Sequence, residues 1–288
     1  MNILVKKQDG SEEGFNKDKL LISIKKNSGS EKVAEDVVKY FEKEKIKETT
    51  SDEIFELTKK FLLEKGDKKA FLRYNLPKSI YKLGPEGFAF EKFIAEVFQS
   101  YKYNPVHVGQ KIQGKCVVHE MDIVATKNNE LMTAELKFHN TRSKKSDLKV
   151  ALYMKARFDD ILNSGFYKDK MPRQVIITNT KFTNNAKAYA KCVGMEMIAW
   201  NYPEGDNLYD FILRSGVHPI TAITCIPNKA KEYFLRKKIV SCYDLMKDNK
   251  KMLENNPFIP NDKITEIIEE IKVMCNFSKE ERSLGNVD

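Results

Sequence analysis

Two carboxylates and a lysine that could perform hydrolysis lie in a short stretch near the middle of the chain. The segment HEMDIVATKNNELMTAELKFHN, residues 119–140, holds Asp122 on a first apolar run and Glu135 and Lys137 on a second. Because alternate side chains of a strand share one face, Glu135 and Lys137 are expected to point the same way. A hairpin would bring Asp122 close to them at one end of a sheet. The opposite face of the second strand would be core, formed by Ala134, Leu136 and Phe138.

This arrangement suits the hydrolysis of a phosphodiester with a divalent metal ion. Mg²⁺ prefers carboxylate oxygen and keeps several waters, so one or two carboxylates and a substrate phosphate complete its coordination. The ion makes a nucleophile of water, and a lysine beside it can orient that water or hold the phosphate. The predicted ligands of Mg²⁺ or Mn²⁺ are Asp122, Glu135 and the backbone carbonyl of Leu136.

The same residues also have a simpler explanation. Glu-x-Lys on an exposed strand is common, and it gives a salt-bridged surface hairpin without any metal. Glu135 and Lys137 alone favour that explanation. Asp122 on the neighbouring strand and Glu91 on the preceding helix favour a metal site, although Glu91 is also explained as an ordinary residue on a helix flank.

Helices and strands alternate through residues 85–205, the segment that must position this site. FAFEKFIAEVFQSY carries apolar residues at helical spacing, with Glu91 at the edge of the apolar stripe. Two strands follow across an Asn128-Asn129 turn, then a helix, a short buried strand QVIITN, a second helix and a last strand MEMIAW. This order, α-β-β-α-β-α-β, predicts a mixed sheet flanked by helices.

The stretches GFAFEKFIAEVF and HEMDIVATKNNELMTAELK together resemble the Mrr-like branch of the PD-(D/E)XK restriction-endonuclease superfamily. That branch has a Gly-x-x-Phe-Glu helix, an aspartate on a strand and Glu/Gln-x-Lys on the next strand, and the resemblance covers residues 85–200. It implies a catalytic set of Glu91, Asp122, Glu135 and Lys137. In that set Asp122 and Glu135 bind the metal and Lys137 positions the nucleophile. Glu91 is an auxiliary ligand or orients the other groups.

Other polar residues near this site have two explanations each. The basic loop 138–145, which leaves the second strand, either clamps DNA phosphates or is simply solvated. His139 would support the site or lie partly exposed at a strand end, and Gln174 would face the site or merely begin a strand. The remaining histidines form no catalytic group, and the cysteines, with no CxxC pair, indicate reduced thiols rather than a zinc site.

Residues 1–84 form a separate predicted unit with a strand-like NILVKK, a turn and four helical stretches. Asn16 is of the type that caps a helix N-terminus, Thr50 or Ser51 can cap the third helix, and Leu83-Gly84-Pro85 ends the last helix. VKKQDGSEEGFNKDKL is similar to the opening of the ATP-cone, the nucleotide-sensing domain best known from ribonucleotide reductases. A small helical domain with a charged hairpin is the alternative.

The ATP-cone resemblance implies a set of residues that contact an adenine nucleotide. They are Lys7, Gln8, Asn16, Lys19 and Leu20, with Leu20 against the base. A hairpin lysine, a helix N-terminus and a helix lysine suit a triphosphate, but Gln8 stands where the family usually has arginine. No GxxxxGK[ST] occurs, so ATP or dATP is expected to regulate the protein rather than to be hydrolysed.

Residues 206–288 are predicted to be mostly helical. The stretch ITAITCIPNKAKEYFLRKKIVSCYDLM has a weak resemblance to the helix-hairpin-helix, a module that lays its hairpin backbone on DNA phosphates. The hairpin glycines are replaced by Pro227-Asn228. A helical packing or dimerisation module explains the segment at least as well.

The composition fits a globular protein of several domains. The chain has 288 residues, 41% of them hydrophobic and 32% charged, and its net charge of +9 is compatible with a polyanionic partner. No apolar run could span a membrane and no signal core is visible, so a cytoplasmic location is expected. The predicted fold class is α/β (α+β) multidomain. It combines an ATP-cone, a restriction-endonuclease-like mixed sheet flanked by helices, and a small helical C-terminal domain.

These observations predict a Mg²⁺-dependent endonuclease of double-stranded DNA that ATP or dATP regulates through the N-terminal domain. Cone-type domains commonly act through assembly, so a homo-oligomer is expected, and the nuclease resemblance implies defence against foreign DNA. The alternative is a non-catalytic, nucleotide-responsive DNA-binding regulator that keeps the nuclease fold. A nucleotide-sensing scaffold is a third possibility. Intact Asp122, Glu135 and Lys137 favour the enzyme.

Overall fold

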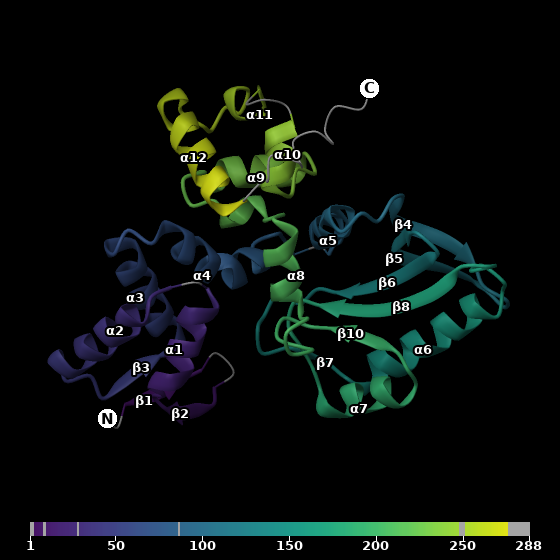
Figure 1. Ribbon diagram of the computed structural model, residues 1–288, viewed down its shortest axis with the longest axis horizontal. Coiled ribbons are helices and arrows are strands. Elements are labelled where there is room, and N and C mark those ends of the chain that lie inside the picture. Colours follow the sequence, from purple (N-terminus) through teal and green to yellow (C-terminus); the bar gives the residue numbers. More distant parts are fainter. Residues whose placement is uncertain (1–2, 8–9, 28, 86, 248–250, 276–288) are drawn as a thin grey trace.

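The structure is a computed structural model that describes residues 3–7, 10–27, 29–85, 87–247 and 251–275. It is a mixed α/β fold with strands and helices at the N-terminus, a central five-stranded sheet, and helices at the C-terminus (Figure 1). The predicted fold class is therefore confirmed. Within the described residues every helix is too short or too polar to cross a membrane.

The N-terminal part combines a small sheet with four helices. The sheet has the order β2-β1-β3, with β1 antiparallel to β2 and parallel to β3. Asn16 caps the first helix, and Thr50 forms a full capping box with Glu53 at the third, as their residue types predict. The elements are β1 (Leu4–Lys6), β2 (Glu12–Gly14), α1 (Lys17–Lys26), α2 (Glu31–Lys43), β3 (Glu48–Thr50), α3 (Ser51–Glu64) and α4 (Lys68–Tyr81).

The central sheet has the order β10-β8-β6-β5-β4. Strands β4, β5 and β6 are antiparallel, whereas β6 pairs in parallel with β8, and β8 with β10. The sequence predicts four of these strands but not β4, an edge strand whose VHVGQKIQ is mostly polar and exposed. The strands are β4 (Val106–Gln113), β5 (Val118–Lys127), β6 (Glu130–Lys137), β8 (Met171–Thr178) and β10 (Glu196–Ile198).

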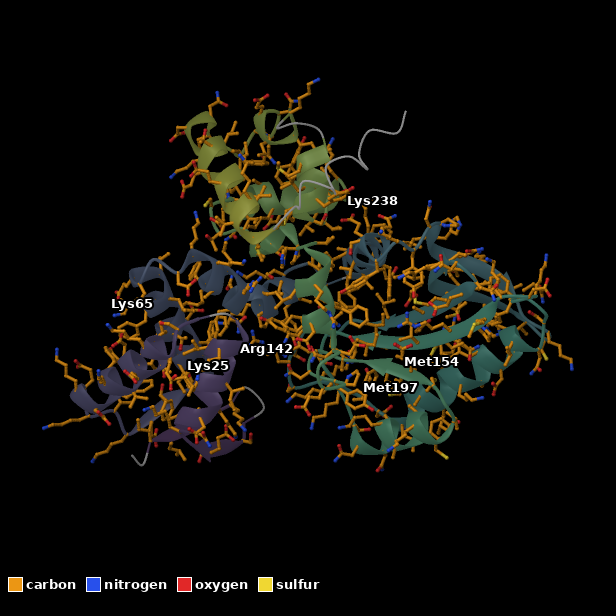
Figure 2. The ribbon with its side chains drawn as sticks, viewed as in Figure 1. Lys25, Lys65, Arg142, Met154, Met197 and Lys238 are labelled. Atoms are coloured by element: carbon orange, nitrogen blue, oxygen red, sulfur yellow. The ribbon has the colours of Figure 1, made fainter. Side chains whose placement is uncertain are left out.

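Helices cover both faces of this sheet. On one face lie α6 (Leu148–Leu162) and α7 (Asn184–Cys192), and their core includes Met154 of α6 and Met197 of β10, both labelled in Figure 2. On the other face lie α5 (Phe88–Ser100) and α8 (Leu208–Ser215). A two-stranded sheet of β7 (Lys145–Ser146) and β9 (Lys181–Phe182) lies beyond the end of β6. The site residues on β5 and β6 are therefore held between two packed layers.

The C-terminal helices continue the core of the α5 face. Buried residues of α4, α5 and the segment after residue 217 belong to one apolar cluster, so the three parts of the chain pack together. Pro227 precedes α9, at the place where a helix-hairpin-helix would have its glycines. The resemblance of this segment to a helix-hairpin-helix stays a prediction. The elements are η1 (Ile220–Ala222), α9 (Asn228–Arg236), α10 (Cys242–Lys247), α11 (Lys251–Glu254), η2 (Asn261–Lys263) and α12 (Ile264–Met274).

A buried pair of acids joins α5 to α10. Glu96 is only 5% exposed, and burial together with the charge of Asp244 raises its pKa to about 8. Lys92 compensates part of this charge, with its Nζ 3.1 Å from Asp244 Oδ2 and 3.7 Å from Glu96 Oε1. The folded protein therefore keeps a proton on Glu96 at pH values where the unfolded chain has lost it.

Glu96→Gln is expected to raise the melting temperature at pH 9 and to leave it nearly unchanged at pH 5. Because the folded pKa lies above the ordinary value of 4.5, the stability that Glu96 contributes is complete below that value and is lost as pH rises to about 8. One pKa unit corresponds to about 1.4 kcal/mol. Since Lys92 offsets part of the cost, we expect a gain of roughly 2 kcal/mol at pH 9.

Thermal melting of both proteins from pH 5 to pH 9 measures this effect. Glu232→Gln, an exposed change on α9, is the control and should follow the wild type at every pH. Parallel melting curves of Glu96→Gln and wild type across this range would show that Glu96 is ionised throughout.

Candidate functional site

Asp122 lies where β5 separates from β6. The pairing of the two strands ends at Ile123 and Ala134, and residues before Ile123 pair only with β4. The usual alternation breaks at the same point, because Met121 and Ile123, two positions apart, belong to cores on opposite faces of the sheet. Asp122 Oδ2 accepts a hydrogen bond of 2.6 Å from Leu136 N, so its side chain replaces the missing strand carbonyl.

Glu135 and Lys137 share the face of β6 that the sequence assigns to them. Lys137 Nζ donates to Glu135 Oε1 at 2.6 Å, and Glu135 is only 5% exposed. The Lys137 side chain keeps 30% of its surface exposed, so its ammonium remains accessible to a ligand. The alternate residues Ala134, Leu136 and Phe138 pack in the core on the α5 face, as predicted.

Arg157 of α6 also belongs to this cluster, although the sequence does not predict it. Its Nη1 donates to Glu135 Oε2 at 2.9 Å, and its Nη2 donates to the backbone carbonyl of Glu120. The guanidinium lies over the ring of Tyr153, and only 11% of the side chain is exposed. The sequence does place Arg157 near the sheet, because it lies three positions after Met154 and next to Phe158, at the edge of the apolar stripe of α6.

The acids of the cluster influence one another. Burial, followed by the charge of Glu135, raises the pKa of Asp122 to about 7, although the Leu136 N–H partly opposes this rise. Burial also raises the pKa of Glu91, with further contributions from Glu135 and Glu120. Two carboxyl groups with raised pKa values at one place, Asp122 and Glu91, are typical of a functional site.

Glu91 is half-buried in the first turn of α5, next to a glycine that leaves room for it. A Cβ atom at Gly87, the residue before the helix, would lie 3.2 Å from Glu91 Oε1. Gly87 therefore allows the carboxylate to fold back over the start of α5. The position of the Glu91 carboxylate therefore explains why position 87, the first of GFAFE, is glycine.

The donor groups suit a metal ion that needs two carboxylates, not one that needs three. Among the described residues, no group of three or more His, Cys, Asp or Glu side chains is placed to hold a metal ion. Both oxygens of Glu135 already accept hydrogen bonds from Lys137 and Arg157, whereas Asp122 bonds to the described residues through Oδ2 alone. Mg²⁺ needs only one or two carboxylates because it keeps its waters, so Asp122 and Glu135 suit it. An ion that requires three acids does not fit.

The other polar residues near the site have structural partners. His139 Nε2 lies 3.0 Å from Ser146 Oγ, and burial lowers the pKa of its imidazole. Gln174 pairs with Thr133 and so lies on the same face of the sheet as Glu135, and its amide already donates to the Phe158 carbonyl and to Tyr167. His119 binds the carboxylate of Asp160. His218 is fully buried, and His107 lies on β4.

Two of the predicted nucleotide residues, Lys7 and Lys19, contact one acid. Lys7 Nζ lies 2.7 Å and Lys19 Nζ 2.9 Å from Glu13 Oε2, and these two lysines lower the pKa of Glu13. Asn16 Oδ1 accepts from Lys19 N and caps α1. Leu20 is 6% exposed and packs in the core, so it offers little surface to a base. Gln8 lies outside the described residues.

Two family matches divide the chain. Residues 3–82 match the ATP cone domain, which confirms that the N-terminal part is an ATP-cone and indicates that it binds a nucleotide. Residues 218–275 match the family described as AF1548-like, C-terminal. The two matches lie on either side of the segment that contains Asp122, Glu135 and Lys137.

Two proteins similar to this chain are described as uncharacterized or of unknown function. This chain is 37% identical over 135 residues to an uncharacterized protein of Archaeoglobus fulgidus, covering 47% of this chain and 74% of that protein. The chain belongs to the family of that protein. The crystal structure of the protein of unknown function AF1548 is similar over 67% of this chain and 100% of that chain, with 29% identity and a TM-score of 0.52. A repair endonuclease from Pyrococcus abyssi gives a TM-score of 0.30 at 20% identity over 40% of this chain and 46% of that chain, which supports no inference about function.

Proposed function

We propose that this protein is a Mg²⁺-dependent DNA endonuclease regulated by ATP or dATP at its ATP-cone domain. The observation that carries the proposal is the position of Asp122, where β5 leaves β6, beside the Glu135–Lys137 pair. The PD-(D/E)XK resemblance of residues 85–200 supports it. In this proposal the domains are the ATP-cone at 1–84, the nuclease at 85–205 and the C-terminal helices at 206–288.

The residues of the chain have separate parts in the proposed reaction. Asp122 and Glu135 would hold Mg²⁺, which when bound supplies charge neutralisation and an acidified water. Lys137, whose ammonium is partly exposed, holds the scissile phosphate or orients the attacking water. Arg157 holds the Glu135 carboxylate in position from the α6 side by donating to its Oε2. Glu91 of α5, near Glu135 and Lys137, is an auxiliary ligand or orients the other groups.

Supercoiled plasmid incubated with the full chain tests the proposal. We expect nicking or linearisation with Mg²⁺ or Mn²⁺, none with EDTA, and a change in rate when ATP or dATP is added. Regulation requires that the nucleotide bind one conformation or assembly better than another. A homo-oligomer whose size changes with ATP in light scattering is therefore part of the proposal, and defence against foreign DNA is the role that the resemblance implies.

A non-catalytic, nucleotide-responsive DNA-binding regulator is the second candidate. One observation favours it: both oxygens of Glu135 are already bonded to cations, and no three-acid group occurs in the described part of the chain. DNA binding that responds to ATP, with no cleavage under any metal or nucleotide, would favour this candidate over the enzyme.

Glu13→Gln is expected to bind ATP about three- to tenfold more tightly than the wild type. Glu13 pairs with both Lys7 and Lys19, so a triphosphate must displace its carboxylate before it can bind these lysines. A neutral amide removes that competition, and a tenfold gain corresponds to about 1.4 kcal/mol. Isothermal titration with ATP and dATP measures the change.

Glu12→Gln, on the same short strand, is the matched control because Glu12 is exposed and forms no ion pair with these lysines among the described residues. It should bind ATP as the wild type does. Unchanged or weaker binding by Glu13→Gln would place the nucleotide away from Lys7 and Lys19.

A further inference from the structure

A hollow of about 540 Å³ lies between the ATP-cone domain and the loop that follows β6. Lys78, Tyr81 and Lys82, at the end of α4, line one side, and residues 140–143 line the other. Arg142 is central to it, and Figure 2 shows this residue between the N-terminal helices and the sheet. A second hollow of about 210 Å³ adjoins it and shares Tyr81 and Arg142.

Arg142 lies against two aromatic rings and has no acidic partner in the part of the chain that the structure describes. Its guanidinium lies 5.4 Å from the ring centre of Tyr81 and 5.9 Å from that of Phe55, so two aromatic rings of the ATP-cone hold it. Within the described residues it pairs with no carboxylate, and its Nη2 is buried without a hydrogen-bond partner. Because Arg142 lines the hollow, an anion bound there would supply the missing charge and hydrogen-bond acceptors.

The surroundings of Arg142 are basic and rich in donors. Lys82 is exposed and forms no ion pair among the described residues, and Lys181 lines the adjoining hollow. Asp52 also lines the main hollow, but it lies 3.1 Å from Lys78. The hydroxyls of neighbouring loop residues complete a set suited to phosphate oxygens, namely Thr141 and Ser143.

The hollow is close to the candidate active site along the chain. Arg142 follows Lys137 by five residues, which span at most about 17 Å, the length of roughly five nucleotides along a DNA duplex. Asn179 links the two regions, because its side chain bonds both the N–H and the carbonyl of His139 at 2.8 Å. Tyr81 of the ATP-cone donates to the Asn179 carbonyl at 3.4 Å.

We infer that this hollow binds a backbone phosphate of the DNA strand a few nucleotides from the scissile bond. The ATP-cone and the central segment would then hold DNA jointly, through Lys82 on one side and Arg142 on the other. The inference rests on the proposed function. It gives the ATP-cone a direct contact with the substrate, in addition to its nucleotide site.

Fluorescence anisotropy of a short labelled DNA duplex, with EDTA present so that no cleavage occurs, tests the site. We expect Arg142→Ala to weaken DNA binding about tenfold or more and to lower the salt dependence of log Kd by about one. Because Arg142→Ala removes a stacked side chain, Lys82→Glu is the second variant. Lys82 is exposed, so this change should leave melting unaltered and still weaken binding. Lys32→Ala, on the exposed side of α2, is the control and should bind as the wild type does.

The outcomes separate this inference from the nuclease proposal. Equal DNA binding by Arg142→Ala, Lys82→Glu and wild type would overturn the phosphate site, while loss of cleavage in Asp122→Asn would still support the nuclease. Loss of the ATP-induced melting shift in Arg142→Ala, with DNA binding intact, would assign the hollow to the nucleotide and overturn the inference. A wild type that binds no DNA overturns both. Weakened binding without any cleavage supports the site and contradicts the enzyme.

Discussion

Asp122→Asn and Lys137→Ala are each expected to lower plasmid cleavage about 10³-fold. Asparagine keeps an oxygen that can accept from Leu136 N, so the local strand geometry should persist, but it removes the negative charge that a metal ion needs. Alanine at 137 removes the accessible ammonium and leaves Glu135 bonded to Arg157. Initial rates of plasmid nicking in Mg²⁺ measure both effects.

Melting in EDTA distinguishes loss of chemistry from loss of folding. The folded pKa of Asp122 is about 7, above the ordinary 3.8, so the stability that Asp122 contributes is complete below 3.8 and is lost as pH rises through about 7. Asparagine does not ionise, so the variant does not lose this stability as pH rises. At pH 8 Asp122→Asn should therefore melt at or above the wild-type temperature while remaining inactive.

Lys127→Ala is the matched control for Lys137→Ala, because Lys127 lies at the far end of the same hairpin, over the ring of Tyr103. It should cleave at the wild-type rate. Wild-type cleavage by both Asp122→Asn and Lys137→Ala would place the active site elsewhere or assign the activity to a contaminant.

Local pattern is sufficient to predict much of this protein. The amphipathic spacing of 88–101 gives α5, and the alternation on β6 gives the shared face of Glu135 and Lys137. The ATP-cone also follows from a short motif and its helix caps. In each case the decisive contacts lie within one element or between neighbours in sequence, where periodicity and capping act.

The features that the sequence does not predict depend on tertiary packing. Strand β4 is a mostly polar edge strand, and Gly109, with φ of 65°, interrupts it opposite the point where β5 leaves β6. The sequence of β5 does not predict that Met121 and Ile123 pack on opposite faces of the sheet. Arg157 reaches Glu135 only because α6 packs across the sheet, 22 residues further along the chain. Helical spacing shows that Arg157 borders an apolar stripe, but not which acid it meets.

Arg157→Met is expected to destabilise the metal-free protein by about 3 kcal/mol or more. Glu135 is 5% exposed, and without Arg157 the only described cation left to pair with it would be Lys137. Methionine retains contact with the sulfur-rich surroundings of Met121 and Met154, so packing is largely conserved. Thermal melting in EDTA should show a fall of roughly 5–10 °C.

Two further variants show whether the loss comes from the buried charge. Glu135→Gln combined with Arg157→Met should recover most of the stability, because a neutral amide needs no cation, and the two changes are then strongly non-additive. Arg236→Met, on the exposed face of α9, should change stability by less than about 0.5 kcal/mol. Additive losses in the double variant would mean that Arg157 acts through packing alone.

Mg²⁺ should raise the melting temperature of Arg157→Met more than that of the wild type. In the variant a metal ion at Asp122 and Glu135 would replace the charge that the guanidinium supplied, whereas in the wild type Arg157 already compensates Glu135. The same titration therefore examines the metal site without any measurement of cleavage. An equal Mg²⁺ shift in the two proteins would mean that the ion binds away from Glu135, and the ligands would then have to be sought around Asp122 and Glu91.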